Sequence, residues 1–156
     1  MMIPIYHDIV GRGMVMELAF SIDRDGLVED THAAVYTQIG EWVRQCYGSP
    51  ISETSGKDDD TYNLVLQAGV SFDRFQLRED IATGQRVRRW SIARQDKGSE
   101  AWASIANGTS IGRKWIVLLN ATTTLGTSST LRLTIDRAVA PPQIAQFAAF
   151  KACATH

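Results

Sequence analysis

The stretch Phe75–Val87, which reads FQLREDIATGQRV, decides the fold class of this chain. In its first part, apolar Phe75 and Leu77 alternate with polar neighbours, as in a strand with one buried face, and in its second part Gly84 marks a turn. A second informative stretch, WASIANGTSIGRK, follows at Trp102–Lys114 and turns at Gly108. Short strand-like runs separated by glycine turns predict an all-β region.

The alternation of apolar and polar residues that is typical of strands continues over residues 62–150. Leu131, Leu133 and Ile135 alternate with polar residues, and turns rich in glycine, asparagine, serine and proline separate the runs. About seven such strands without helices predict an antiparallel β-sandwich of jelly-roll type. One side of each sheet then faces a core and the other faces water.

Three details of this region depart from simple alternation. Val87 lies out of phase with Trp90 and Ile92, which predicts a bulge in that strand. The run Trp115–Leu119 is apolar without alternation and predicts a strand buried on both faces. Two prolines at 141–142 should stop regular pairing before a last strand over residues 144–150.

Residues 1–48 differ in period from the sandwich region. The apolar run Met14–Phe20 predicts a buried strand, and a helix should begin at Asp30 or Thr31 and end at Gly48. The polar segment 49–61 is typical of a linker. We therefore expect three parts: a strand and helix over residues 1–48, a linker over 49–61 and a sandwich over 62–156.

Composition excludes several classes of protein. The 156 residues carry a formal charge of −1, so there is no electrostatic reason to expect a nucleic-acid partner. No apolar run is long enough to cross a bilayer, and the amino terminus lacks the pattern of a signal peptide, so we expect a soluble chain. Cys46 and Cys153 are too few for a disulfide framework, and a bridge between them is open but without support in the sequence.

Two motifs of the chain resemble the carboxyl-terminal β-sandwich of the α-L-fucosidases of glycoside hydrolase family 29. Within Phe75–Val87, residues 77–87 match the part L-x-E-x-I-x-x-G-Q-R-V of the family pattern F-x-x-x-x-L-x-E-x-I-x-x-G-Q-R-V, and Trp102–Lys114 is similar to W-x-x-I-A-x-G-T-(T/S)-I-G-x-K. The resemblance continues upstream through Ile5–Gly13, Asp23–Val28 and Ile39–Val43. It implies a galactose-binding-like sandwich preceded by the last strand and helix of a catalytic (β/α) barrel.

The resemblance also implies what this sequence lacks. A retaining glycosidase needs two carboxyl groups about 5 to 5.5 Å apart. In the family these lie on earlier barrel strands that have no counterpart here, and Gly13–Ile22 lacks the asparagines and proline of the family's last strand. We therefore expect no catalytic residue, no cofactor and no hydrolysis of fucosides by this chain alone. Its localisation stays open, although family members are often secreted or lysosomal.

Two main roles remain for the chain itself: a structural domain beside a catalytic barrel, or a lectin-like module that binds a fucosylated glycan. A third role, a complete small glycosidase, is disfavoured by the missing catalytic carboxylates. For the second role, Trp102 is the best sugar platform, because aromatic faces stack on sugar rings, and Glu79 and Arg86 are the polar candidates. The structural alternative is that Glu79 forms an ion pair with Arg86 or Arg88 across strands. A structural role is expected for a further set of motif residues: Gly84, Gln85, Gly108, Thr109 and Gly112.

Other candidates are less specific. The acidic run 58–60 reads as a solvated linker, so no metal site is expected. Asn107 and Asn120 begin glycosylation sequons, which matter only if the chain enters a secretory pathway. Because the apolar residues of 1–48 evolved beside a barrel, we expect either self-association through 1–48 or a separately encoded barrel that docks there.

Overall fold

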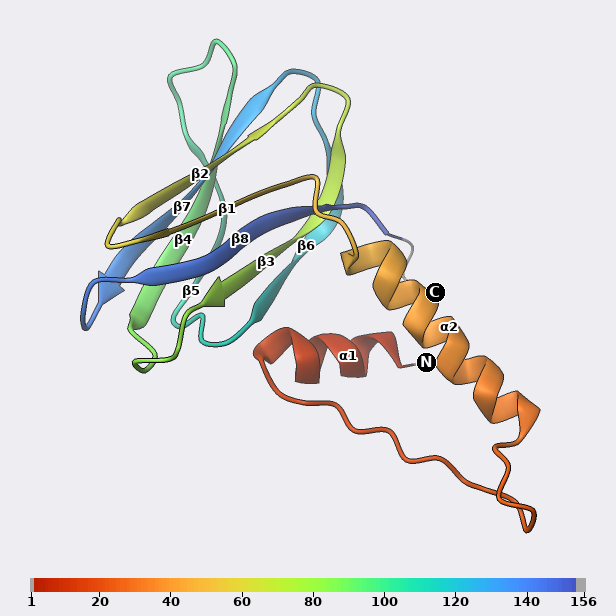
Figure 1. Cartoon of the computed structure of the whole chain (residues 1–156). Helices are drawn as coiled ribbons and strands as arrows, with labels where there is room; N and C mark the ends of the chain where they lie inside the picture. The colour runs from red at the N-terminus through yellow and green to blue at the C-terminus, as the bar shows by residue number, and fades with distance from the viewer. Residues whose placement is uncertain (1, 154–156) are drawn as a thin grey trace.

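The computed structural model describes residues 2–153 and contains a two-sheet sandwich joined to a helical amino-terminal part (Figure 1). The elements run in the order α1 (Ile3–Ile9), the 3₁₀ helix η1 (Val10–Arg12), α2 (Asp30–Tyr47), β1 (Ser52–Lys57), β2 (Thr61–Leu66), β3 (Ser71–Glu79), β4 (Val87–Asp96), β5 (Ala103–Gly108), β6 (Trp115–Thr124), β7 (Ser129–Ala138) and β8 (Gln143–Lys151).

The sandwich consists of two four-stranded antiparallel sheets. One has the strand order β1-β8-β3-β6 and the other the order β2-β7-β4-β5. The inward residues of both sheets form one core, in which Phe75, Leu133 and Phe147 are fully buried. The predicted antiparallel sandwich is therefore confirmed.

Two of the irregular features were predicted correctly and one was not. The pairing of β4 with β7 shifts register between Val87 and Trp90, where the bulge was expected, and β8 contains the expected last strand. By contrast, Trp115–Leu119 is not buried on both faces. It lies in β6, an edge strand whose outer face is only partly covered, and Leu118 is 48% exposed.

The expected strand Met14–Phe20 is wrong. These residues are extended but pair with no strand in the described chain, and the only ladder contact near them is the bridge from Ile22 to Val28. A strand needs a neighbour for its backbone hydrogen bonds, and the described residues supply none here. Upstream, the segment preceding Gly13 forms α1 and η1, two helical elements that were not predicted from the sequence.

The linker expected over residues 49–61 is also wrong in its central part. Ser52–Lys57 form β1, which pairs with β8 at the edge of its sheet. Its side chains are alternately half-buried and exposed and include no large apolar residue. An edge strand of this kind is stabilised by backbone hydrogen bonds and not by apolar side chains. Its sequence is therefore polar and resembles that of a loop. The helix expected after Asp30 is present as α2 and ends at Tyr47, before Gly48.

A disulfide joins the helical part to the end of the sandwich, although no feature of the sequence predicted it. Cys46, in the last turn of α2, is bonded to Cys153, which follows β8. The two positions are 107 residues apart, so no local spacing signalled that they meet. The bridge fixes the carboxyl-terminal turn of α2 against the sheet that contains β8.

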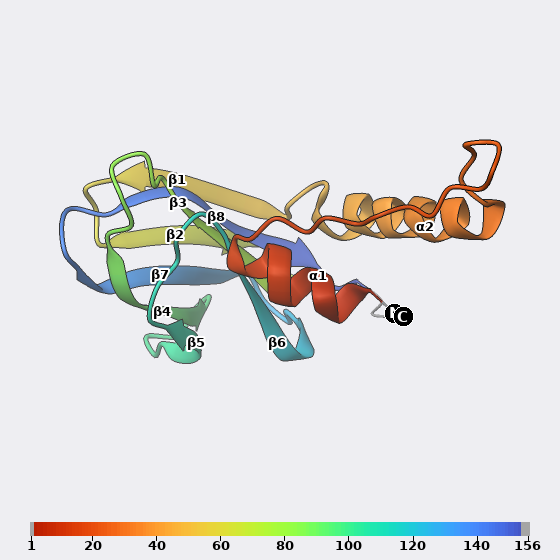
Figure 2. The same cartoon turned by 90° about the horizontal axis from the view of Figure 1, so that it is seen from below.

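The helical part lies on the outer face of the β1-β8-β3-β6 sheet and projects beyond it. Gly11 of η1 packs on Ile116 of β6, and Tyr47 of α2 packs on Phe150 of β8. From there α2 extends away from the sandwich, with the segment 13–29 running beside it (Figure 2). No helix within residues 2–153 is long and apolar enough to span a membrane.

Candidate functional site

Glu79, the last residue of β3, is a buried carboxylate that joins two loops of the sandwich. Its Oε1 accepts hydrogen bonds from the backbone N–H groups of Arg86 and Val87, and its Oε2 accepts one from Gly112 at 3.3 Å. The backbone N–H of Glu79 in turn donates to the carbonyl of Gly112 at 2.8 Å. Both carboxylate oxygens are thus engaged by the protein, and the side chain is 3% exposed.

Arg86 contacts Glu79 through its backbone and not through its guanidinium. The guanidinium donates to the carbonyl of Pro141 and to the hydroxyl of Thr83, each at 2.6 Å. The alternative of an ion pair between Glu79 and Arg86 is therefore wrong. The Glu79 carboxylate binds the backbone amides of the loop that follows it, and the Arg86 guanidinium binds this loop to the turn before β8. Gly84, at the centre of this loop, has a φ of +93°, as its predicted turn requires.

The second motif is held by close packing. Gly108 has no positive φ, and a Cβ there would meet the indole of Trp90, so the need for glycine at this position comes from the adjacent ring. The indole N–H of Trp90 donates to the carbonyl of Ser110 at 3.2 Å. Gly112 does adopt a left-handed φ of +64° and lies against the side chain of Gln85. Thr109 is exposed.

Trp102 lies in the loop just before β5, against Arg132 of β7, and no contact brings it together with Glu79 or Arg86 in the described chain. Its indole is half-buried, with the guanidinium carbon of Arg132 only 4.0 Å from the ring centroid. Arg132 is held in place by a hydrogen bond from its Nε to Asn63. One face of the indole is therefore already occupied by a cation. The sugar-binding role of these three residues stays a prediction.

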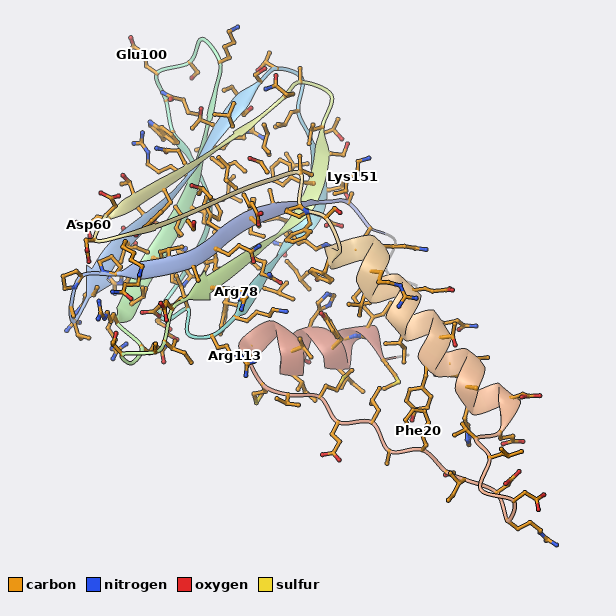
Figure 3. The ribbon with its side chains drawn as sticks, viewed as in Figure 1. Phe20, Asp60, Arg78, Glu100, Arg113 and Lys151 are labelled. Carbon is orange, nitrogen blue, oxygen red and sulfur yellow. A yellow bond between two sulfur atoms is a disulfide. The ribbon has the colours of Figure 1, made fainter. Side chains whose placement is uncertain are left out.

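A cavity of about 600 Å³ borders the Glu79 loops on the outer face of the β1-β8-β3-β6 sheet. It is lined by Lys57, Arg78, Asp80, Arg113 and Gln143, among others. Arg78 and Arg113 point to the same end of the sheet, beside η1 and the start of the segment 13–29 (Figure 3). Burial lowers the pKa of the nearby Lys114, and repulsion from Arg78 and Arg113 lowers it further.

This cavity lacks the pair of carboxylates that glycoside hydrolysis requires. The carboxyl groups on its wall are Glu79, whose oxygens are bonded to backbone amides, and Asp80, which accepts from the N–H of Ala82. Within residues 2–153 no group of three or more histidine, cysteine, aspartate or glutamate side chains is placed to hold a metal ion.

The junction between the helices and the sandwich forms a second polar cluster, which no sequence motif indicates. Arg74 of β3 is 1% exposed and forms a two-point ion pair with Asp73, at 2.6 and 2.9 Å. Its guanidinium lies 5.3 Å from the ring centroid of Tyr47. His7 of α1 reaches the same Tyr47, with 2.7 Å between Nε2 and the hydroxyl oxygen.

The carboxyl-terminal tail is tied into the same cluster. The N–H of Cys153 donates to Asp73 at 3.1 Å, and its carbonyl accepts from Arg74 at 3.2 Å. Tyr6 and Trp42 pack edge to face beside His7, with their ring centroids 5.4 Å apart. Because the partners come from α1, α2, β3 and the tail, local sequence patterns could not have revealed this cluster.

Burial sets the protonation states of the cluster. It raises the pKa of Tyr47 to about 12, so the phenol stays neutral and can donate to His7. It lowers the pKa of His7, and the positive charge of Arg74 lowers it further. The neutral imidazole is therefore the form that the folded chain favours.

Comparison with known proteins places the whole chain beside fucosidases. No protein-family model matches the sequence. Alpha-L-fucosidase 1 of Arabidopsis thaliana is 23% identical over an alignment that covers 92% of this chain and 34% of the plant protein. A crystal structure assigned to an α-L-fucosidase of Bacteroides thetaiotaomicron superposes with a TM-score of 0.86 at 26% identity, over 97% of this chain and 33% of the bacterial one.

The chain is related to the carboxyl-terminal region of the family 29 α-L-fucosidases. A family 29 fucosidase of Ruminococcus gnavus, solved with fucose, shares the fold with a TM-score of 0.75 at 14% identity, over 96% of this chain and 36% of that protein. The chain thus spans about one third of the length of these fucosidases. Within this fucosidase-related sandwich, the paired motifs build the Glu79 and Trp90 contacts described above.

The role of Glu79 can be tested by removing its charge. We expect Glu79→Gln to lower the free energy of unfolding by about 1–3 kcal/mol, because an amide offers one acceptor oxygen where three backbone donors converge. Denaturant unfolding followed by tryptophan fluorescence measures the change. Asp80→Asn is the matched control, since asparagine keeps the acceptor for Ala82, and its change should stay below about 0.5 kcal/mol. Equal effects of both substitutions would contradict the assignment.

The His7 contact should make stability depend on pH. Because the pKa of His7 is lower in the folded chain than the unfolded value of 6.5, the unfolded chain takes up this proton first as the pH falls. The contribution of His7 is therefore complete above pH 6.5 and is lost as the pH falls through the folded pKa. Urea midpoints measured from pH 5 to 8 should converge for wild type and His7→Gln at low pH. A difference that does not change with pH would contradict this.

Proposed function

We propose that this chain is a non-catalytic β-sandwich that packs beside and stabilises the catalytic barrel of an α-L-fucosidase, an enzyme that releases α-L-fucose from glycans. The barrel belongs either to the same longer polypeptide or to a separately encoded partner. The proposal rests on the relationship to fucosidases together with the surface of residues 13–35.

The observation that carries the proposal is an uncovered apolar segment held beside an anchored helix. Six large apolar side chains of this segment and of α2 are exposed: Met14, Val15, Phe20, Ile22, Leu27 and Val35. Phe20 packs on Tyr36 of α2 with ring centroids 4.0 Å apart, so the segment is positioned and not simply loose (Figure 3). Apolar patches of this kind mark a surface that another protein covers.

The carboxyl groups along the cavity are engaged by the protein itself, which supports a structural role. Along the cavity beside Glu79, both oxygens of that carboxylate accept backbone hydrogen bonds, and Asp80 follows it directly in the chain. A nucleophile and an acid/base must instead face one bond from two sides. Among residues 2–153, the two carboxyl groups of this cavity do not form such a pair, which supports the scaffold role.

A glycan-binding module is the second candidate function. The observation that favours it is the cavity of about 600 Å³ at the Glu79 loops, a volume within the usual range for a small-ligand site. The half-covered Trp102 does not favour it, because Arg132 occupies one face of the indole. Calorimetric titration with fucose and galactose separates the two functions. A glycan-binding module should release or absorb heat on binding one of these sugars, whereas a purely structural domain should show no binding.

The scaffold role can be tested by supplying a barrel. The barrel of the Bacteroides thetaiotaomicron relative, cut before the region that matches residue 1, would be produced with and without this chain. We expect the chain to raise both the melting temperature of the barrel and its release of nitrophenol from a nitrophenyl α-L-fucoside, because the chain covers apolar barrel surface. The chain alone should release none.

A matched pair of substitutions shows whether the proposed surface is responsible. Val15 is 80% exposed on the segment, and Val139 is 63% exposed in the turn after β7. We expect Val15→Asp to abolish the rise in the melting temperature and activity of the barrel, and Val139→Asp to leave this rise unchanged. Nitrophenol release by the chain alone, or a barrel that gains nothing from the wild-type chain, would contradict the proposal.

A further inference from the structure

Two of the three asparagines of the chain begin the sequence Asn-x-Thr, and the structure places both on edge strands. Asn107-Gly108-Thr109 ends β5, and Asn120-Ala121-Thr122 lies in β6. Neither middle residue is proline, which the sequon excludes. Both asparagines and both threonines are exposed.

The two strands lie on the same side of the sandwich. β1 and β2, the edge strands of the other side, lie against each other, whereas β6 and β5 are the opposite ends of their sheets (Figure 2). In β5, Asn107 pairs in register with Ser91, whose hydroxyl is on the exposed outer face of its sheet. Because both asparagines are exposed, a bulky group on either one would extend into solvent.

The disulfide gives an independent indication of the compartment in which the chain folds. Both cysteines of the sequence are joined in the Cys46–Cys153 bridge. Disulfides persist in the secretory pathway and outside the cell, whereas the cytosol keeps thiols reduced. The lumen of the endoplasmic reticulum is one of the compartments in which such a bridge forms, and it is also the compartment in which asparagine sequons are modified.

From these observations we propose that Asn107 and Asn120 are N-glycosylation sites. In this reaction the side-chain amide nitrogen attacks the anomeric carbon of an oligosaccharide linked to a lipid pyrophosphate. The bond from that carbon to the pyrophosphate oxygen breaks, the lipid pyrophosphate leaves, and the amide nitrogen loses one proton. The products are an N-linked glycan at each edge strand and a free lipid pyrophosphate.

The test is translation of the full chain behind a cleavable secretory leader in the presence of rough microsomes. We expect two successive shifts to lower electrophoretic mobility, one for each attached glycan, and both should be removed by peptide N-glycosidase. The same enzyme converts each glycosylated asparagine to aspartate, so mass spectrometry should detect aspartate at positions 107 and 120. A chain that is inside the microsomes, bridged by its disulfide and unmodified at either asparagine would overturn the assignment of that residue.

Substitutions of the exposed threonines provide matched controls. Thr109→Ala and Thr122→Ala should each abolish one mobility shift. Thr109→Ser and Thr122→Ser should each retain it, because serine also completes the sequon. Transfer takes place as the chain enters the microsome, so the readout does not depend on fucosidase activity or on barrel binding. A mobility shift that survives both alanine substitutions, or free thiols in the imported chain, would contradict the inference.

Discussion

A buried guanidinium holds the helical part of the chain to the sandwich. Arg74 is inaccessible on β3, and three partners surround it: Asp73, the ring of Tyr47 and the carbonyl of Cys153. Breaking a buried ion pair by removing one partner typically costs about 3–5 kcal/mol. Because the partners come from β3, α2 and the tail, the guanidinium links α2 and the tail to the sheet.

The disulfide and the aromatic cluster reinforce the same junction and explain the shape of the molecule. They fix α1 and the carboxyl-terminal turn of α2, while the amino-terminal half of α2 and the segment beside it project into solvent with exposed apolar side chains. A fixed support that carries uncovered apolar surface is suited to receive another protein body. The sandwich behind it is stabilised separately, by its own core and by the Glu79 contacts.

Residue periods in the sequence predicted the sandwich well. Leu131, Leu133 and Ile135 face the core as their alternation indicated, and the phase slip at Val87 marks a real bulge. Predictions failed where an element depends on a partner that is distant in the chain or not present in it. β1 reads as a linker because backbone pairing with β8 holds it, and Met14–Phe20 has strand composition but no neighbour to pair with.

The candidate site was predicted only in part, for a related reason. The motif glycines indicated turns, and Gly84 and Gly112 do adopt left-handed angles, but the requirement at Gly108 comes from the ring of Trp90, 18 residues away in sequence. Glu79 was singled out, yet its partners are backbone amides, which no side-chain pattern reveals. The cluster around Arg74 and the disulfide join parts of the chain that only the three-dimensional fold brings together.

Amide hydrogen exchange of the whole chain, followed by mass spectrometry, tests most directly whether the Arg74 junction makes α1 and α2 part of the sandwich. We expect peptides from α1 and from the carboxyl-terminal half of α2 to exchange as slowly as those from β3 and β8, with residues 14–29 exchanging fast. If α1 and α2 exchanged as fast as residues 14–29 while β3 and β8 stayed protected, the junction would not hold the helices, and the account would be wrong.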